Sequence, residues 1–415
     1  MTTKNIDRLL KQSYGASFQL QQADNRMIKK VLLQLSSLLI ENTAVLIGAN
    51  QKDLARQDAA DPKRDRLLLN EQRIAGIAKA IRLIASLPCP AGQLLHEKVL
   101  SNGIKLQKKS VPLGVVGAIY ESRPNVTFDI AALALRSKNA CVLKGSRDAE
   151  ETNKKAVSII HRALEENGLP AACVTLLPSA REVLEPMLKA TRYIDVIIPR
   201  GSAGLIDYVR RNSLVPTIET GAGVCHIYVE KEADLQKAID IVVNAKVSRP
   251  SVCNAVDTVL VDTSVAVEFF QKLLPPFEEH GVTIMAEPKA YSLLNGYPHL
   301  EKATKESFGQ EYLSLKCSIK VVDGINDAMA HIREYSTRHS ECIISENRKL
   351  CLQFVTGVDA AVVYTNASTR FTDGEEFGLG AEIGISTQKL HARGPFALEK
   401  LVTEKWILQG NGQVR

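Results

Sequence analysis

The feature that most constrains the fold is a regular alternation of apolar, strand-like runs with helix-like stretches, which starts at residue 112. In its first half, apolar runs lie at 115–120, 140–144, 173–177, 194–198 and 215–219, and helical stretches at 127–138, 150–166, 180–190 and 203–211. In its second half, which follows a helix at 233–246, strands are expected near 256–262, 281–286, 318–323, 341–345 and 360–364, and helices at 264–279, 325–337 and 347–356. Strands that alternate with helices are typical of parallel sheets covered by helices on both faces. The sequence therefore predicts an α/β chain with two parallel-sheet domains in series.

The segments outside this alternation predict a helical start and a small β element. Isoleucine, valine and leucine recur at helical spacing through most of the first ninety residues. Asn102-Gly103 lies between two short apolar-alternating runs at 99–107, and this dipeptide favours positive φ at both central positions of a hairpin turn. An isolated hairpin is only marginally stable in water. We therefore expect it to pair with another element, and the strand-like tail at 399–415, which contains Trp406, is a candidate.

Composition excludes several classes of function. The formal net charge of +6 over 415 residues is a mild bias, and no Lys/Arg block with interleaved aromatics indicates nucleic-acid binding. None of the eight cysteines forms a Cys-x-x-Cys pair and the eight histidines do not cluster, so we expect free thiols, a reducing compartment and no metal site. The N-terminal stretch lacks the apolar core of a signal peptide, and no run of about 18 apolar residues exists. A cytoplasmic protein without membrane attachment is expected.

Two polar loops follow strands of the first predicted domain, at the end of the sheet where parallel α/β folds bind ligands. The first loop carries Arg123 and Asn125. The Asn125 amide could donate a hydrogen bond to a developing oxyanion, or it could merely cap the following helix. The second loop carries Lys144, Ser146 and Arg147, which could bind a ribose phosphate or only face solvent.

A third strand-to-helix turn, IPRGSAGL at 198–205, is rich in glycine. Gly201 and Ser202 open the following helix, so backbone N–H groups could face a phosphate there. The motif is not GxGxxG, and Gly-rich turns between strands and helices are common. By itself it indicates a phosphate site only weakly.

The most reactive candidate is Cys253, which follows a Ser-Arg-Pro-Ser turn and precedes a strand. Lys246 and Arg249 lie close to it in the sequence, and nearby positive charge raises the thiolate fraction of a cysteine. The alternative is a buried, inert cysteine that packs as a small apolar side chain. The residues alone leave both interpretations open.

A long Gly-rich segment at 363–395 lacks regular periodicity. Loops of this length in compact domains are often functional. Its Asn366, Ser368, Thr369 and Arg370 could bind a polar amino-acid head group. Alternatively, the segment is only a long connection whose glycines meet the requirements of turns.

Taken together, seven segments in the same order resemble the γ-glutamyl phosphate reductase family, which belongs to the aldehyde dehydrogenase superfamily. The resemblance covers nearly the whole chain, and its most specific stretches are VPLGVVGAIYESRPNVT, IPRGSAGL, GVCHIYV, SRPSVCNAVDTVLV, AHIREYSTRHSECI, NASTRFTDG and STQKLHARGP. It implies an aldehyde dehydrogenase-like fold with two Rossmann-like domains and a small β oligomerisation element. The expected bounds are 1–97 and 112–232 for the NADPH-binding domain, 233–388 for the catalytic domain, and 98–111 and 389–415 for the oligomerisation element.

The resemblance also implies residue roles. Cys253 matches the nucleophile, and Asn125 matches the oxyanion-hole asparagine, joined by the backbone N–H of Cys253. Lys144 matches the lysine that contacts the adenosine ribose. NAD-preferring relatives carry a glutamate three residues later, whereas this chain has Arg147, which fits a 2′-phosphate and hence NADPH. Glu311 falls near the relatives' ribose-contacting glutamate.

The remaining candidates complete two binding sets. Ser146, Gly201 and Ser202 join the predicted cofactor site. The predicted anchors for the substrate phosphate and glutamyl head are Arg123, Arg249, Asn366, Ser368, Thr369 and Arg370.

The implied reaction is the NADPH-dependent reduction of L-glutamyl 5-phosphate to L-glutamate 5-semialdehyde and phosphate through a cysteine thioester, the second step of proline synthesis from glutamate. A homo-oligomer is expected, and the lability of the acyl phosphate suggests a complex with glutamate 5-kinase. One alternative is a hydrolytic aldehyde dehydrogenase, in which Glu219 would be the general base. The other is a non-catalytic dinucleotide-binding or interaction protein on the same fold.

Overall fold

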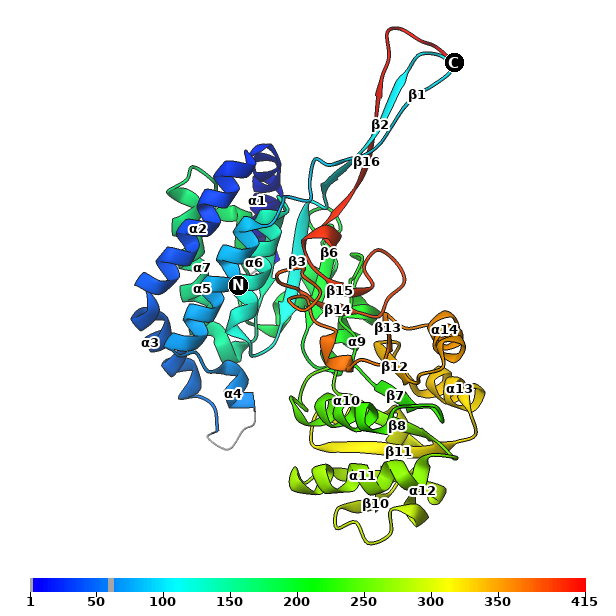
Figure 1. Cartoon of the computed structure of the whole chain (residues 1–415). Coiled ribbons are helices and arrows are strands. Elements are labelled where there is room, and N and C mark those ends of the chain that lie inside the picture. The colour runs from blue at the N-terminus through cyan, green and yellow to red at the C-terminus, as the bar shows by residue number, and fades with distance from the viewer. Residues whose placement is uncertain (1–2, 59–62) are drawn as a thin grey trace. The chain divides into compact units, whose positions relative to one another are not determined.

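The computed structural model describes residues 3–58 and 63–415, and the chain forms two compact units (Figure 1). The first comprises residues 1–220, 378–384 and 396–415, and the second comprises residues 221–377 and 385–395. Each unit contains one parallel sheet against which helices pack. The predicted α/β class with two parallel-sheet domains is therefore confirmed.

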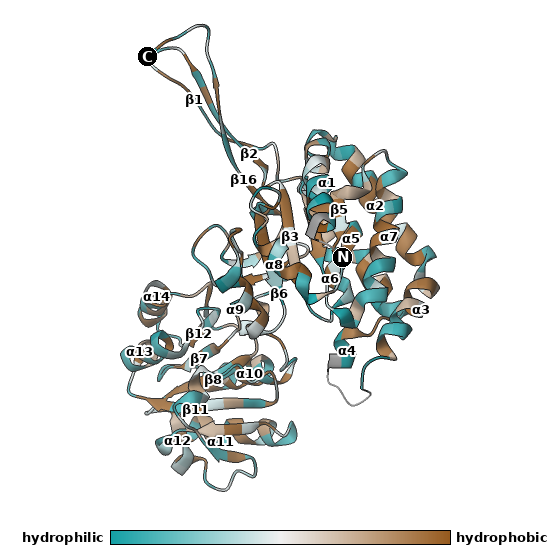
Figure 2. Cartoon of the chain, turned by 180° about the vertical axis from the view of Figure 1, so that it is seen from behind, coloured by the Kyte–Doolittle hydropathy of each residue, from teal (hydrophilic) through white to brown (hydrophobic). Residues whose placement is uncertain are grey.

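The first unit is built on a four-stranded parallel sheet of order β5-β4-β3-β6. Its strands are β3 (Val115–Tyr120), β4 (Ala140–Lys144), β5 (Val174–Leu176) and β6 (Val196–Arg200). The accompanying helices are α6 (Pro124–Arg136), η1 (Arg147–Ala149), α7 (Glu150–Glu165), η2 (Ala171–Cys173), η3 (Arg181–Val183), α8 (Leu184–Leu188) and α9 (Ala203–Asn212). Every residue of β3 and β4 is buried, and Figure 2 shows β3 as largely hydrophobic. Burial on both faces explains why these strands read as continuous apolar runs.

The strand predicted at 215–219 is absent, and this prediction is wrong. The segment runs beside β6 and forms only an isolated bridge between Ile197 and Thr217. Pro216 lacks an N–H group and cannot donate to a ladder, although its carbonyl accepts a bond from Ile197 at 2.8 Å.

The N-terminal part of the first unit is helical, as predicted. Its helices are α1 (Thr3–Gln22), α2 (Asn25–Glu41), α3 (Thr43–Leu54), α4 (Lys63–Leu67) and α5 (Glu71–Ser86). The apolar stripe of α2 is buried against α5 and α7. Among the described residues, no single helix has the length and apolar character of a membrane span; α2 and α3 meet that test only as a pair bent by 70°.

A three-stranded antiparallel sheet of order β1-β2-β16 extends from the first unit (Figure 1). It consists of β1 (Leu94–Val99), β2 (Lys105–Pro112) and β16 (Val402–Gln409), so the predicted pairing of the hairpin with the tail is confirmed. The turn differs from the prediction: only Gly103 has a positive φ, of 82°, and its N–H donates to the carbonyl of Leu100 at 2.9 Å. The connection is therefore longer than the two-residue turn that Asn102-Gly103 favours.

The second unit contains a seven-stranded parallel sheet of order β10-β9-β11-β8-β7-β12-β13. Its strands are β7 (Cys225–Val229), β8 (Val256–Asp262), β9 (Thr283–Ala286), β10 (Leu300–Lys302), β11 (Lys316–Val322), β12 (Ser340–Ile344) and β13 (Val362–Thr365). Its helices are α10 (Leu235–Val247), α11 (Ala266–Glu279), α12 (Pro288–Leu293), η4 (Glu306–Gly309), α13 (Ile325–Tyr335), α14 (Arg348–Gly357) and η5 (Thr369–Phe371). Near the C-terminus, β14 (Gly384–Ser386) pairs with β15 (Gly394–Phe396), and η6 (Leu398–Lys400) precedes β16.

Strand β7 is absent from the expected elements, and it moves the boundary between the units. It pairs in parallel with β8 and β12, so the second sheet begins before residue 233. A fully buried run of five residues shows neither helical nor strand periodicity, which explains why the pattern did not reveal it. The units divide at 220/221, whereas the predicted bounds were 112–232 and 233–388. The functional roles attached to those ranges stay predictions.

Candidate active site

Cys253 lies in the loop between α10 and β8. All eight cysteines lie in the described residues and none is in a disulfide; only Cys253 and Cys351 among them are half-buried, and the others are buried. The Cys225 thiol donates a hydrogen bond to the Cys253 carbonyl oxygen at 3.2 Å. Burial raises the pKa of Cys225 well above its ordinary value, so this thiol stays protonated and available as a donor.

Gly223 packs directly against the backbone of Cys253. A Cβ at position 223 would overlap the Cys253 carbonyl oxygen and lie 2.6 Å from its carbonyl carbon. Backbone atoms cannot rotate away as the end of a flexible side chain can. Only glycine therefore fits at position 223 while Cys253 keeps its place.

The residue after the cysteine, Asn254, is held by the segment that includes η5. The Thr369 hydroxyl donates to the Asn254 carbonyl at 2.7 Å, and the Asn254 amide donates to the Thr372 carbonyl at 2.9 Å. The Arg370 guanidinium donates to the Asn254 side-chain oxygen. Asn254 and Thr369 are both buried. These bonds fix the C-terminal side of the cysteine loop.

Two arginines lie within electrostatic reach of this loop. Arg370 donates from Nε to the Ser248 hydroxyl at 3.1 Å. Burial lowers the pKa of Arg370 and the positive charge of Arg249 lowers it further, while Asp373 and Cys253 oppose the change. The Arg370 guanidinium therefore lies within electrostatic reach of both Arg249 and Cys253.

Lys246 does not add to this charge in the way its place in the sequence suggested. Its ammonium is buried, lies 3.4 Å from the Asp257 carboxylate and donates to the Lys316 carbonyl at 2.9 Å. Burial raises the pKa of Asp257 to about 6, and Lys246 opposes that rise. Lys246 is thus a buried partner that fixes the strand and loop at 314–316.

The predicted substrate anchors of the 366–370 segment fall into two groups. The Asn366 side chain accepts from the Ser345 N–H and donates to the Ser345 carbonyl, both at 2.9 Å. Ser368 and Thr369 are buried, and the Ser368 hydroxyl accepts from the Arg370 N–H at 3.3 Å. These three side chains bind the chain's own backbone, whereas Arg370 remains half-buried beside the cysteine loop.

In the first unit, Asn125 is the second residue of α6 and is exposed. The N-cap position belongs to Arg123, also exposed, and no side chain caps the helix there, so Asn125 is not the helix cap. Its Nδ2 donates to the Asp129 carboxylate at 3.0 Å. Burial raises the pKa of Asp129 to about 6, opposed by this hydrogen bond and by Arg200. The second N–H of the Asn125 amide is not needed for this contact.

Lys144 ends β4 and is only 7% exposed. Its ammonium makes no hydrogen bond and no ion pair within the described residues. Burial lowers the pKa of Lys144 and the charge of Arg147 lowers it further, opposed by Glu182. The Ser146 hydroxyl beside them accepts from the Ser122 N–H at 3.2 Å. Two cations within electrostatic reach of each other, one of them without an ion pair in the described residues, suit an anionic ligand.

A cavity of about 220 Å³ adjoins this loop. Its lining includes Gly145, Ser146, Asn153, Leu176 and Ser179, all of the first unit. The lining combines apolar and hydrogen-bonding groups, which suits a small planar or sugar-like ligand group.

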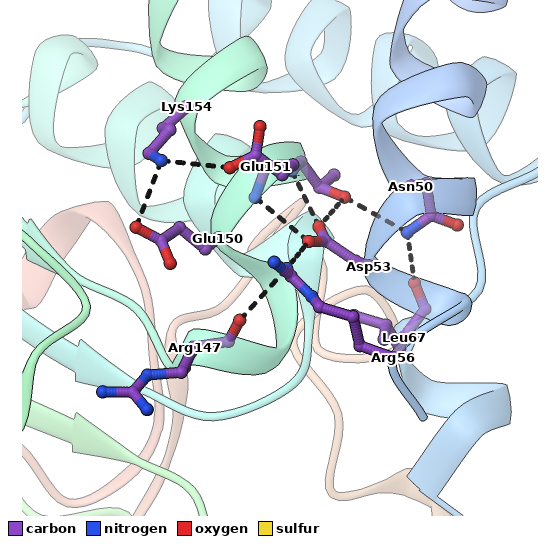
Figure 3. A network of polar contacts seen from close by, with 9 residues as sticks. Asn50, Asp53, Arg56, Leu67, Arg147, Glu150, Glu151 and Lys154 are labelled. Atoms are coloured by element: carbon purple, nitrogen blue, oxygen red, sulfur yellow. Dashed lines mark hydrogen bonds and ion pairs between the residues drawn. The ribbon is translucent and has the colours of Figure 1, made fainter. Parts of the chain in front are cut away.

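The turn that carries Arg147 is held from α3 by a polar network (Figure 3). The Asp53 carboxylate accepts from the N–H groups of Glu151 and Thr152 at 3.1 and 2.8 Å, which caps the first turn of α7. Arg56 forms an ion pair with Asp53 and donates to the Arg147 carbonyl at 3.4 Å. Figure 3 shows the Arg147 side chain extending away from the network, so its guanidinium is left to other partners.

The N-terminus of α9 is occupied by a carboxylate of the chain itself. Glu121 accepts from the Ser202 N–H at 2.8 Å and from the Ser202 hydroxyl at 3.1 Å. A Cβ at Gly201 would lie 2.5 Å from the same carboxylate. The turn thus binds an anionic group, as its sequence suggested, but in this structure the group is Glu121.

Glu311 lies in the second unit, on the segment that precedes β11. Its Oε1 accepts from the Gly223 N–H at 2.9 Å. The structure thus brings Glu311, Gly223 and Cys253 together within one unit. Gly223, Asn254, Asp53 and Glu121 were not among the predicted site residues, because no motif in the sequence signals these contacts.

Comparison with known proteins gives concordant results. The sequence profile described as the aldehyde dehydrogenase family matches residues 4–288. A γ-glutamyl phosphate reductase of Chlorobium phaeovibrioides is 52% identical over 94% of this chain and 92% of its own length. One of Bacteroides thetaiotaomicron is 47% identical over the full length of both chains. The crystal structure of the γ-glutamyl phosphate reductase of Thermotoga maritima has a TM-score of 0.95 at 40% identity and covers 99% of each chain.

Proposed function

Because the chain belongs to the γ-glutamyl phosphate reductases of the aldehyde dehydrogenase family, we propose that it reduces L-glutamyl 5-phosphate to L-glutamate 5-semialdehyde and phosphate with NADPH. Membership of this family makes the chain an oxidoreductase. The observation that carries the substrate and mechanism is the loop of Cys253. That loop carries half-buried Cys253, whose backbone carbonyl packs against Gly223 and whose neighbour Asn254 accepts a hydrogen bond from Arg370.

In the proposed reaction, the Cys253 thiolate attacks the γ-acyl carbon of the acyl phosphate. A C–S bond forms while the bond from the acyl carbon to the phosphate oxygen breaks, so inorganic phosphate leaves and a thioester remains. Arg249 and Arg370 favour the thiolate and attract the phosphoryl group. NADPH, when bound, supplies the hydride for the reduction. Collapse of the hemithioacetal then returns an electron pair to the sulfur and releases the semialdehyde.

Asn125 keeps the oxyanion role that the family resemblance implies. One N–H of its amide donates to Asp129, which fixes the orientation of the amide and leaves the second N–H for the developing negative charge. The backbone N–H of Cys253 is the other proposed donor. One donor of this kind contributes on the order of 3 kcal/mol to the transition state.

Lys144, Ser146 and Arg147 fit the adenosine end of a dinucleotide. Lys144 is only 7% exposed and its ammonium lacks a hydrogen bond within the described residues, and the exposed guanidinium of Arg147 lies within electrostatic reach of it. We propose that Lys144 contacts the ribose, that Arg147 binds a 2′-phosphate, and that the adjoining cavity accepts part of the adenosine. A guanidinium is suited to two parallel hydrogen bonds with a phosphate. Glu311 remains a proposed contact for a ribose of the cofactor.

Arg147→Ala is expected to raise the KM for NADPH about tenfold to a hundredfold, because a charged hydrogen bond contributes about 1.5–3 kcal/mol. The KM for NADH should stay near its original value. Steady-state kinetics with both cofactors check this, and Arg333→Ala, which removes an exposed arginine of α13, is the control. An equal rise in the KM for NADPH and in the KM for NADH would contradict a contact between Arg147 and the 2′-phosphate.

Glu121→Gln is expected to tighten NADPH binding about twofold to tenfold, which is the range for removing one charge near a helix N-terminus. The reason is competition: a cofactor phosphate at Gly201 and Ser202 must replace the Glu121 carboxylate. Fluorescence titration of NADPH measures the Kd. An unchanged Kd would mean that the cofactor phosphates bind away from α9.

One observation favours a second candidate function, hydrolytic oxidation of an aldehyde. Burial raises the pKa of Glu219, as suits a general base for deacylation by water. The two functions differ in their dependence on phosphate. The proposed enzyme oxidises the semialdehyde in steady state only when phosphate is present, whereas a hydrolytic enzyme turns over without it.

Self-association through β1, β2 and β16 is part of the proposal. Large apolar side chains are exposed on these strands, with Val99 at 65% and Trp406 at 52%. Exposed apolar groups on a projecting sheet suit contact with a second copy of the chain. A cytoplasmic location and a complex with glutamate 5-kinase stay predictions from the sequence.

A further inference from the structure

We propose that Glu311 is a positioning residue for the nucleophile, acting on Cys253 through the backbone of Gly223. This inference deepens the proposed function, since it assigns to Glu311 a task that the reaction needs before any cofactor takes part. It rests on contacts within the second unit alone.

The first step of the argument is how the stretch before β7 is held. The residues 221–224 precede the strand, so their N–H groups find partners outside its ladder. Gly221 donates to the Ile385 carbonyl at 3.3 Å, Gly223 to Glu311 Oε1 at 2.9 Å, and Val224 to the Thr337 hydroxyl at 2.9 Å. Gly223 and Val224 are buried, and buried N–H groups require partners. Without Glu311, Gly223 would lose the acceptor that fixes it.

The second step is the contact between Gly223 and the nucleophile. The Gly223 Cα lies so close to the Cys253 carbonyl that no side chain fits between them. The Cys225 thiol donates to the oxygen of the same carbonyl at 3.2 Å. The peptide group that follows Cys253 is thus confined by Gly223 and Cys225. A shift of Gly223 must move the Cys253 backbone, and with it the thiol and the N–H of the proposed oxyanion site.

The third step is the rigidity of the segment that carries Glu311. The Tyr312 N–H donates to Asp257 at 3.2 Å, and the Tyr312 hydroxyl donates to the Ser307 carbonyl at 3.0 Å. Buried Lys246 holds the same segment through the carbonyls of Ser314 and Lys316. Leu313 has a positive φ of 53°, a backbone conformation that persists only where surrounding contacts fix it. The backbone segment that carries Glu311 is therefore fixed, so the Glu311 carboxylate can hold Gly223 in place.

The test uses alkylation of the full-length protein by iodoacetamide in the absence of NADPH. Peptide mass spectrometry follows modification at Cys253 and at Cys351, the other half-buried cysteine, which serves as an internal reference. Glu311→Ala is expected to slow modification of Cys253 relative to Cys351 about tenfold, because a displaced thiol moves away from the positive charge of Arg370, which favours the reactive thiolate. Glu311→Gln keeps an oxygen that accepts from Gly223 and should restore most of the rate.

Glu334→Ala, which removes an exposed glutamate of α13 that pairs with Lys305, should leave both cysteines at their original rates. Thermal unfolding of each variant shows whether the fold is intact. The inference is overturned if Glu311→Ala leaves the Cys253 rate unchanged and raises only the KM for NADPH, as a pure cofactor contact would. It is also overturned if Glu311→Gln is as slow as Glu311→Ala. A wild-type protein that lacks reductase activity while Cys253 still depends on Glu311 would instead refute the proposed function.

Discussion

Gly223→Ala is expected to lower kcat/KM at least about a hundredfold, because a displacement of a reacting group by about 1 Å has effects of this size. The added methyl would overlap the Cys253 carbonyl, a backbone group that can yield only if the nucleophile loop moves. The loss should appear in the acylation step and not in NADPH binding. Single-turnover kinetics and a cofactor titration separate the two.

Gly309→Ala is the matched control for this substitution. A Cβ at position 309 would meet only a ring carbon of Tyr335, at an ordinary 3.9 Å. The activity of the Gly309→Ala variant should stay close to that of the unmodified chain. If Gly223→Ala were equally active, the close packing of Gly223 on Cys253 would not matter for the reaction.

Cys253→Ser is expected to reduce turnover on the order of 10⁴-fold or more, the scale observed when an enzyme loses its nucleophile. A serine hydroxyl at this position ionises far less readily than a thiol, and the chain offers it two arginines but no established base. NADPH binding, which involves the first unit in the proposal, should persist. Phosphate-dependent assays together with a cofactor titration check both parts.

Cys351→Ser is the control, because it removes a half-buried thiol outside the proposed site. Cys351 lies on α14 and its thiol donates to the Ser345 carbonyl at 3.4 Å. Normal activity is expected for this variant. Activity in Cys253→Ser close to that of the original protein would refute the role of the thiol.

The sequence predicted most elements of the two sheets because their strands are short, apolar and separated by helices of clear periodicity. Strand β7 was not predicted, because its five residues are all buried and do not alternate between buried and exposed positions. The segment at 215–219 has the composition of a strand, but Pro216 cannot continue a ladder. Gly103 alone adopts the positive φ that was expected of the Asn102-Gly103 pair.

Motifs in the sequence single out Cys253 and Lys144 as candidate site residues, and their roles stay predictions. The side chains that hold these residues in place could not be predicted, because they depend on contacts between residues far apart in the sequence. Glu121 and Ser202 are separated by 81 positions, and Asp53 and Thr152 by 99. Nothing local distinguishes such a glutamate or aspartate from a solvated one.

The most direct test of the account is a single turnover in the oxidative direction without phosphate. Semialdehyde and NADP are mixed with the enzyme, NADPH is followed by absorbance, and the quenched protein is examined by peptide mass spectrometry. The account predicts a burst of one NADPH per active chain, then arrest, with a glutamyl group on Cys253 that is released when phosphate is added. Continuous NADPH formation without phosphate, or a burst that leaves Cys253 unmodified, would contradict it.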